Sequence, residues 1–238
     1  MVGILYEKRK DHFKIIHTDL PNLLSKKANF HNIDKFIHLS SLGIEKADDS
    51  LYAISKLEGE KKVKENFKKS IILKPSIVFS VDDNFTTNFM TLLSRLPVMP
   101  LYYGGKTKFM PIHVADITDI LYDMVHGNYQ ELTLECIGPQ ILSFKEIIIE
   151  ILNSINKKRL LIPMPLPLAK ISAKILQILP KPLLTEDQLN LLKYDNINSG
   201  IHKTNYDLGF KTKKLFRDEI DKYSYNWRIG GQFAKQND

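Results

Sequence analysis

Short apolar runs alternate with longer helical patterns along the first half of this chain. Residues 35–39 and residues 70–79 are short and apolar, as buried strands are, and the second run ends near Pro75. Residues 51–67, which lie between them, are rich in Lys, Glu and Ala and predict a helix. Because two strands joined through a helix run parallel, the pattern predicts an α/β fold with a Rossmann-like parallel sheet.

The other expected elements come from the same periodicities. Residues 2–5 have the pattern of a further strand, and residues 13–28 have helical spacing that Pro21 interrupts. Capping boxes predict that helices begin after Ser143 and after Thr185. We also expect helices at 85–95 and at 117–125, the latter with Asp116 as its N-cap, and extended segments at 109–114 and 132–137.

Composition narrows the class of protein. The single cysteine, Cys136, excludes an intrachain disulfide, and no run approaches the ~20 apolar residues that span a bilayer. The net charge of +7 comes from dispersed lysines, which is typical of a solvated surface. The sequence has neither zinc-finger spacing nor a basic region leading into heptads, so we expect no nucleic-acid partner, and no metal site is predicted.

Tyr52 and Lys56 form the central motif. Residues four apart lie on one face of a helix, which places the lysine ammonium beside the tyrosine phenol. A nearby positive charge favours the phenolate and lowers the phenol pKa from about 10 toward neutrality. Such a tyrosine can pass a proton to or from a carbonyl or alcohol during hydride transfer. Taken alone, the spacing also fits a half-buried tyrosine next to a solvated lysine.

Ser40 ends the strand predicted at residues 35–39, and Ser41 follows it. The carboxyl ends of strands in an open α/β sheet are where ligands bind. A hydroxyl at this place can hydrogen-bond the same oxygen that the tyrosine protonates. We therefore expect Ser40, Tyr52 and Lys56 to form one catalytic site.

The order of these pieces carries more information than any one of them. A strand, Ser-Ser, a loop, a helix with Tyr-x-x-x-Lys and a strand ending in Lys-Pro-Ser-Ile-Val-Phe at 74–79 follow one another. This order resembles the extended and atypical members of the short-chain dehydrogenase/reductase superfamily, which are related to NAD-dependent sugar epimerases and dehydratases.

Downstream motifs narrow the resemblance. They are Asp-Asn-Phe at 83–85, Gly-Lys-Thr-Lys-Phe at 105–109, Pro-Ile-His-Val-Ala-Asp-Ile at 111–117, Ile-Pro-Met-Pro-Leu-Pro-Leu at 162–168 and Leu-Leu-Thr-Glu-Asp-Gln at 183–188. The series is similar to the family of NAD(P)H-binding accessory subunits of respiratory complex I and their bacterial relatives. The resemblance implies catalytic roles for Tyr52 as acid/base, Ser40 as its support and Lys56. It implies cofactor-binding roles for Lys56 at the nicotinamide-ribose hydroxyls, Gly3 near the adenosine side, and Pro75 and Ile77 beside the nicotinamide.

A glycine-rich turn between a first strand and a first helix, which would hold the cofactor pyrophosphate, does not occur in the chain. Before Gly43 the only glycine is Gly3. In the family, a stretch like residues 2–6 belongs to the fourth strand, so the resemblance implies a sheet that lacks its first three strands. We therefore expect an N-terminally truncated version of a longer protein. The residue that distinguishes NAD from NADP would lie in the missing segment.

We expect two regions in the chain. Residues 1–137 would form the remainder of the cofactor-binding domain, with a substrate-side insertion at about 81–110. Residues 138–238 would form a small C-terminal substrate-side or docking region. Within it, residues 160–184 are apolar and proline-rich and carry Lys170, Lys174 and Lys181. This composition fits a helix at a membrane interface and also a helix packed into the C-terminal region.

Three functions stay open at this point. The first is an NAD(P)H-binding protein like the complex I accessory subunit, with structural or weakly redox use of the cofactor. The second is an active oxidoreductase or sugar-nucleotide epimerase or dehydratase that uses Tyr52 and Lys56, and the third is a truncated, cofactor-free interaction module. The first implies association with a respiratory complex or a membrane surface, in the cytoplasm at the inner face of the membrane, or in the mitochondrial matrix of a eukaryote. No residue identifies a substrate.

Overall fold

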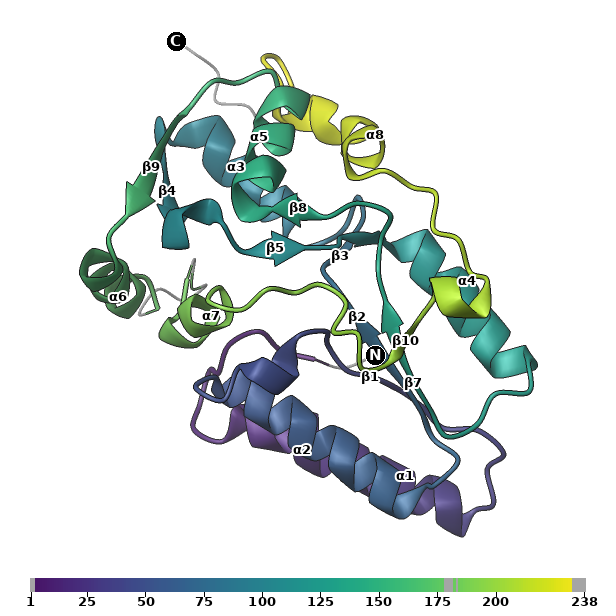
Figure 1. Ribbon diagram of the computed structural model, residues 1–238. Helices are drawn as coiled ribbons and strands as arrows, with labels where there is room; N and C mark the ends of the chain where they lie inside the picture. The colour runs from purple at the N-terminus through teal and green to yellow at the C-terminus, as the bar shows by residue number, and fades with distance from the viewer. Residues whose placement is uncertain (1–2, 178–181, 183, 233–238) are drawn as a thin grey trace.

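The computed structural model describes residues 3–177, 182 and 184–232. A parallel sheet flanked by helices lies beside a second group of short strands and helices (Figure 1). The helices are α1 (Leu20–Phe30), α2 (Leu51–Asn66), α3 (Thr86–Arg95), α4 (Val114–His126), α5 (Phe144–Ser154), α6 (Leu166–Leu176), α7 (Glu186–Leu191) and α8 (Phe216–Asp221). The strands are β1 (Ile37–Leu39), β2 (Ile71–Pro75), β3 (Val78–Phe79), β4 (Val98–Tyr102), β5 (Lys108–Phe109), β6 (Ile112–His113), β7 (Leu132–Cys136), β8 (Leu142–Ser143), β9 (Leu160–Met164) and β10 (Lys203–Thr204).

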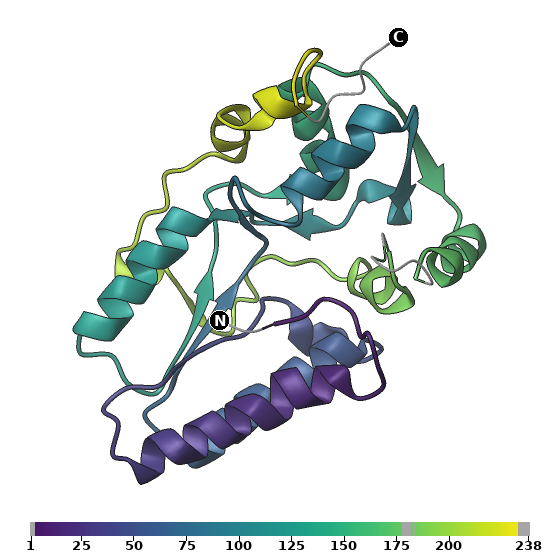
Figure 2. The same ribbon diagram turned by 180° about the vertical axis from the view of Figure 1, so that it is seen from behind.

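Four parallel strands form the central sheet, in the order β1-β2-β7-β10. Side chains alternate between the two faces of a strand. Ile71 and Leu73 of β2 pack with Ile117 and Ile120 of α4, whereas Lys74 of the same strand reaches Glu60 of α2. The two faces of the sheet are therefore covered by α4 on one side and by α1 and α2 on the other (Figures 1 and 2).

A π-helical segment, Lys14–Asp19, runs directly into α1, which begins at Leu20, so Pro21 stands at the start of a shorter α-helix, one of the two outcomes expected from the sequence. Pro21 lies at the first turn of α1, where a missing N–H is tolerated. The preceding turn packs closely on α2: a Cβ added at Gly59 would lie 1.9 Å from the backbone oxygen of His17. Only glycine at position 59 permits this approach of the two helices.

Lys74 is fully buried, and its ammonium lies between two carboxylates. Nζ is 2.9 Å from Oε1 of Glu60, which is itself buried, and it also contacts the partly exposed Glu45. A buried ammonium is stable only when such partners offset its loss of hydration. This Lys74 network therefore holds α2 and the loop before it on the sheet.

The second group of elements has its own apolar core. Strands β4 and β9 pair in parallel, β3 pairs with β6 in parallel, and β5 pairs with β8 in antiparallel fashion. Helices α3, α5 and α8 pack around these strands (Figure 1). The buried side chains of this core include Phe79, Met90, Leu93, Leu101, Phe144, Ile147, Ile148, Ile151, Phe216, Ile220 and Trp227.

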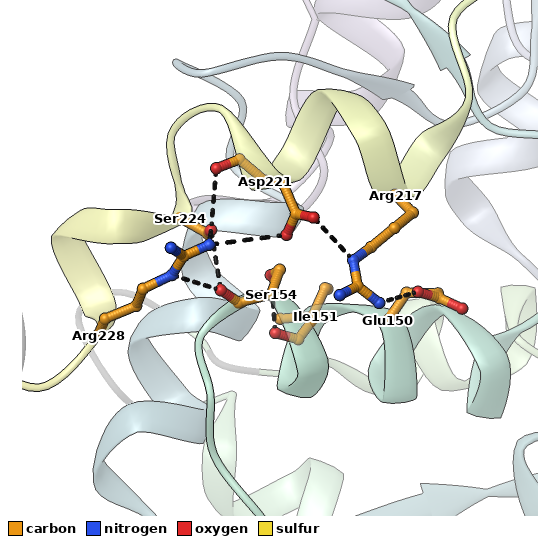
Figure 3. A network of polar contacts seen from close by, with 7 residues as sticks. All are labelled: Glu150, Ile151, Ser154, Arg217, Asp221, Ser224 and Arg228. Carbon is orange, nitrogen blue, oxygen red and sulfur yellow. Dashed lines mark hydrogen bonds and ion pairs between the residues drawn. The ribbon is translucent and has the colours of Figure 1, made fainter.

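Two arginines fasten α8 and the turn after it to α5 (Figure 3). The Arg217 guanidinium donates to Glu150 at 2.9 Å and to Asp221 at 3.0 Å. Arg228 Nε donates to the Ser154 carbonyl oxygen at 2.8 Å. Side chains of this Arg217 network are about a third or more exposed, as Glu45 is, whereas Lys74 and Glu60 are almost inaccessible.

The α/β fold with a parallel sheet is confirmed, and so are both capping boxes, at Ser143 and at Thr185. The strand expected from residue 70 does end at Pro75, and the chain then enters a different sheet as β3. The segment expected at 109–114 likewise divides between β5 and β6.

Two expected elements are corrected. Residues 3–5 form no strand, and Val2 of the expected strand lies outside the described residues. Helix α4 begins at Val114, because the side chain of His113 caps it by accepting from the Ala115 N–H at 3.2 Å. Asp116 therefore lies in the first turn of α4 and is not its N-cap. The sequence patterns also missed β4 and β9, which contain prolines and find each other across some sixty residues.

Candidate functional site

Tyr52 and Lys56 lie on the face of α2 that packs against the sheet and the π-helical segment. Helix α2 begins at Leu51 because Ser50 caps it, its hydroxyl accepting from the Ala53 N–H at 3.2 Å. The i, i+4 spacing then places both side chains in the interior, where each is less than a tenth exposed. The structure thus brings together the two residues that the motif predicted.

The phenol of Tyr52 is hydrogen-bonded to Ser41, the second of the two serines after β1. Its ring is held edge-on by Phe13 and by His17, at 5.8 and 5.2 Å between ring centroids. Burial raises the pKa of Tyr52, the Ser41 hydrogen bond opposes this in part, and the negative charge of Asp187 raises the pKa a little further. This direction is opposite to the one expected from the sequence, because burial has the largest effect on the phenol.

Lys56 has no carboxylate within ion-pair distance among the described residues. Its Nζ lies 5.8 Å from the Tyr52 ring centroid and donates to the Leu39 carbonyl oxygen at 3.3 Å. Burial lowers the pKa of Lys56 to about 8, and the charge of Glu60 one turn further along α2 only partly opposes this. The ammonium therefore has hydrogen-bonding capacity left for another group.

Ser40 is buried at the carboxyl end of β1. Its N–H donates to the Leu73 carbonyl oxygen at 2.8 Å, but its hydroxyl has no hydrogen-bond partner among the residues that the structure describes. Nε2 of His38 is likewise buried without a hydrogen-bond partner among these residues. The pKa of His38 falls to about 4, first through burial and then through repulsion by Lys56 and Lys74. Buried polar atoms without partners are rare in proteins, and they often mark a binding site.

His17 supports Tyr52 from the π-helical segment. Its Nε2 accepts from the Ile4 N–H at 3.3 Å, and its Nδ1 lies 3.0 Å from the Ser55 hydroxyl, which itself donates to the Tyr52 carbonyl oxygen. These partners require a neutral imidazole with the proton on Nδ1. Burial, with repulsion by Lys56, His38 and His12, lowers its pKa to about 4 and keeps it neutral.

The three other cofactor-binding positions named from the sequence lie in different settings. Pro75 is buried at the end of β2, and its carbonyl oxygen accepts from the Leu42 N–H at 2.9 Å. Ile77 is half-buried and packs on the core of the second group of elements. Gly3 is exposed, and a Cβ added there would meet no atom within 4 Å. The geometry at Gly3 thus shows no close approach that would require glycine.

Sequence reasoning missed the residues that approach from the C-terminal half. Asp187 of α7 accepts from the Ser50 hydroxyl at 2.9 Å and from the N–H groups of Leu51 and Tyr52 at 2.6 and 3.2 Å. Asn196 accepts from the Ser76 hydroxyl at 2.6 Å. No local pattern could reveal these contacts, because each joins segments more than a hundred residues apart.

The described part of the chain holds neither a cluster of metal ligands nor a helix that could cross a membrane. No group of three or more His, Cys, Asp or Glu side chains there could hold a metal ion. None of the helices at 3–177, 182 and 184–232 is long and apolar enough to cross a bilayer. Cys136 is buried, which raises its pKa to about 12, so it is not a reactive thiolate.

Comparison with known proteins gives relatives of one kind. The chain is 24% identical over 213 residues to the mitochondrial 40 kDa subunit of NADH-ubiquinone oxidoreductase from Neurospora crassa. It is 26% identical over 201 residues to subunit 9 of the 1 alpha subcomplex of mitochondrial NADH dehydrogenase [ubiquinone] from Mus musculus. These alignments cover 89% and 83% of this chain but only 56% and 53% of the relatives, so the chain spans a little more than half their length. No protein-family model matches the chain.

Solved structures with the same fold include a dehydratase, a reductase and a further enzyme solved with NAD. The NAD-dependent NDP-hexosamine 5,6-dehydratase TunA, from tunicamycin biosynthesis, matches with a TM-score of 0.63 at 12% identity, over 95% of this chain and 75% of that one. The dTDP-4-dehydrorhamnose reductase of Bacillus anthracis, solved with NADP, matches with a TM-score of 0.57 at 18% identity, over 68% and 63%. The enzyme WbmG of Bordetella bronchiseptica, solved with NAD, matches with a TM-score of 0.60 at 12% identity, over 94% and 69%.

The sequence relatives and the solved structures agree with the resemblance read from the motifs. The chain is a relative of these mitochondrial NADH dehydrogenase subunits and has the Rossmann-like fold of NAD-dependent epimerases, dehydratases and reductases.

Proposed function

We propose that this protein is an NAD(P)H-binding, short-chain dehydrogenase/reductase-like protein of the complex I accessory-subunit type, with the nicotinamide end of the cofactor at Tyr52 and Lys56. The observation that carries the proposal is the buried ammonium of Lys56, which donates to the Leu39 carbonyl oxygen and has no carboxylate within ion-pair distance in the described part of the chain. Burying a charge is costly unless a ligand or partner uses it. The related subunits and the enzymes solved with NAD or NADP support this assignment.

The residues of this chain fit one half of the cofactor. The Lys56 ammonium and the partnerless Ser40 hydroxyl are donors suited to ribose hydroxyls, and both lie near the carboxyl end of β1, where ligands bind in such sheets. When bound, the cofactor would supply a hydride. Gly3 is exposed, and a Cβ added there would meet no atom within 4 Å, so its surroundings give no support to the role expected for it near the adenosine side.

We infer that the cofactor has a structural or weakly redox role. The Tyr52 phenol has a raised pKa and is engaged by Ser41, so it stays protonated near neutral pH. A general acid or base works best with a pKa near the operating pH. An active oxidoreductase or epimerase is the second candidate, which the hydrogen-bonded Tyr52–Ser41 pair beside Lys56 favours.

Fluorescence titration of NADH and NADPH with the purified protein tests the proposal. We expect saturable binding that Lys56→Met weakens by about tenfold or more, since a charge-assisted hydrogen bond is lost. Lys64→Met, which removes an exposed lysine two turns along the same helix, should change nothing. No saturable binding of either nucleotide would overturn the proposal in favour of a cofactor-free interaction module. Tyr52→Phe separates the first two candidates: a structural role predicts unchanged binding, and a catalytic role predicts loss of a measurable redox activity.

We further propose that the residues after 137 dock this protein on a respiratory complex at the inner face of the membrane, while the residues before 137 hold the cofactor. The outer face of α6 and β9 carries exposed apolar side chains, namely Leu160, Ile162, Leu168, Ile171 and Ile175. The opposite face of α6, with Ala169 and Ala173, packs against Tyr102 and Leu189. Lys170 and Lys174 stand beside the apolar side chains, a combination that suits an anionic membrane surface. Ile178 and Lys181 of the same stretch lie outside the described residues.

Co-sedimentation with vesicles that contain anionic lipid tests the docking proposal. We expect lipid-dependent pelleting, and we expect the double change Ile171→Gln and Ile175→Gln to abolish it. Ile201→Gln, which removes an equally exposed isoleucine elsewhere, is the matched control. Equal pelleting of all three proteins, or none, would refute a membrane contact at this face.

A further inference from the structure

The first turn of α2 takes its hydrogen-bond partners from two distant parts of the chain. A helix leaves its first four N–H groups without partners inside the helix. Two of them are satisfied close to the cap: the Ser50 N–H donates to the Ala47 carbonyl oxygen at 3.2 Å, and the Ala53 N–H donates to the Ser50 hydroxyl. The other two belong to Leu51 and Tyr52, and both donate to the carboxylate of Asp187. The N-cap of α2 is therefore completed by a residue 135 positions away from Tyr52.

Asp187 is itself held firmly. It lies in the first turn of α7, which the Thr185–Gln188 capping box begins. Burial raises the pKa of Asp187, and the hydrogen bonds from Ser50, Leu51 and Tyr52 oppose this only in part. The Ser50 hydroxyl also donates to it. Helix α7 is anchored in turn by Leu189, which packs with Ala169, Ala173 and Tyr102.

A second set of bonds joins the same two segments just beside this cap. Asp49 accepts from Lys193 Nζ at 2.6 Å and from the Tyr194 hydroxyl at 3.1 Å, and its carbonyl oxygen accepts from Asn190 at 2.8 Å. These groups are exposed, and surface ion pairs contribute little to stability. They bring α7 to α2 without touching Tyr52, so they offer a natural control.

We propose that Asp187 is a positioning residue for Tyr52: by capping α2 at Leu51 and Tyr52 it fixes the phenol opposite Ser41. The inference rests on the proposed role of Tyr52 and extends it, because it makes the geometry of the cofactor site depend on a helix of the C-terminal region. The charge of Asp187 also acts on the phenol directly, where it favours the neutral form.

The test uses the whole 238-residue chain with two readouts at Tyr52 that do not involve the cofactor. One is amide hydrogen exchange at Leu51 and Tyr52, and the other is titration of the Tyr52 phenol, followed by carbon-13 at Cζ and assigned with Tyr52→Phe. In Asp187→Asn, which keeps the size and loses the charge, we expect the two amides to exchange about tenfold faster or more, and the phenol pKa to fall. Asp187→Ala should increase the exchange rates of the two amides further. If the alanine variant does not fold, both readouts are taken from Asp187→Asn alone.

Two controls make the result specific. Glu186→Gln removes the same charge one residue away, where the side chain only faces Lys174 at 3.9 Å, and Asp49→Asn cuts the neighbouring link to Lys193. Both should leave the two readouts unchanged. Unchanged readouts in Asp187→Asn, or equal changes in either control, would overturn the inference. If the chain binds no nucleotide while Asp187→Asn still shifts Tyr52, the proposed function fails and the positioning role stands.

Discussion

Two ion networks fasten a helix to the rest of this molecule, and they differ mainly in burial. The Lys74 network joins β2 to α2 in the interior, where Lys74 and Glu60 are almost inaccessible. The Arg217 network joins α8 to α5 at the surface, where water reaches every charged group (Figure 3). The contacts have similar lengths, yet only the interior charges have no solvent to replace a lost partner. The lengths of the contacts therefore do not show which network stabilises the fold more. The losses of stability caused by mutations in each network should show it.

The largest effect is expected at Lys74. Lys74→Met leaves the buried carboxylate of Glu60 without its cation, and breaking a buried pair on one side typically costs about 3–5 kcal/mol of unfolding free energy. Urea unfolding at pH 7 measures it. The double change Lys74→Met and Glu60→Leu should recover much of the loss, because no charge is then stranded. A loss no larger than that of Lys69→Met, at an exposed lysine in the turn between α2 and β2, would contradict the difference assigned to burial.

Replacement of Lys56 is expected to raise the unfolding free energy, whereas replacement of Lys74 is expected to lower it. The folded-state pKa of Lys56, about 8, lies below its usual 10.5, so below pH 8 the folded protein carries a charge that its interior disfavours. Lys56→Met should therefore raise the unfolding free energy at pH 7 by about 3 kcal/mol, the equivalent of this pKa difference. Denaturant unfolding of both proteins measures it.

The pH dependence supplies the check on this prediction. The wild type sheds the Lys56 proton more readily when folded, so it gains stability as pH rises from 8 to 10.5, and the advantage of Lys56→Met should vanish over that window. A difference that persists unchanged at pH 10.5 would mean that packing of the methionine causes it. A variant that is more stable but binds nucleotide less would show that the fold keeps Lys56 for function.

The comparison of regions also explains what could be read from the sequence. Tyr52 and Lys56 were placed on one helix face correctly, because spacing along a helix is a local pattern. The hydroxyl that bonds the Tyr52 phenol belongs to Ser41 and not to the expected Ser40, whose hydroxyl has no partner among the described residues. The capping boxes at Ser143 and Thr185 were likewise local. Asp187 was not foreseen, since its contact with α2 depends on the path of the whole C-terminal half. The direction of the Tyr52 pKa was predicted wrongly for the same reason: burial and the charge of Asp187 are tertiary effects.

The buried His38 should make the unfolding free energy of the protein fall in acid. Its pKa of about 4 in the folded state lies below its usual 6.5, so the unfolded chain binds a proton that the folded one refuses, and stability falls as pH drops from 6.5 toward 4. At pH 4.5 this group alone should cost about 2.5 kcal/mol. His38→Leu should remove that part of the loss, measured as unfolding free energy at pH 7.5 and 4.5. His126→Leu, at an exposed histidine on α4, should not, and equal acid slopes in all three proteins would exclude His38 as the cause.

The smallest effect is expected at Arg217, and it completes the comparison. Arg217→Met removes ion pairs to Glu150 and Asp221, but all three side chains are about a third or more exposed, so water replaces the lost partner and the cost should stay below about 1 kcal/mol. High salt screens exposed charges and spares buried ones, so this small cost should shrink further in 1 M NaCl, roughly ten times ordinary ionic strength, while that of Lys74→Met should not. A loss at Arg217 as large as at Lys74 would mean that the surface network fixes α8 cooperatively. In that case burial would no longer be the property that ranks the two networks.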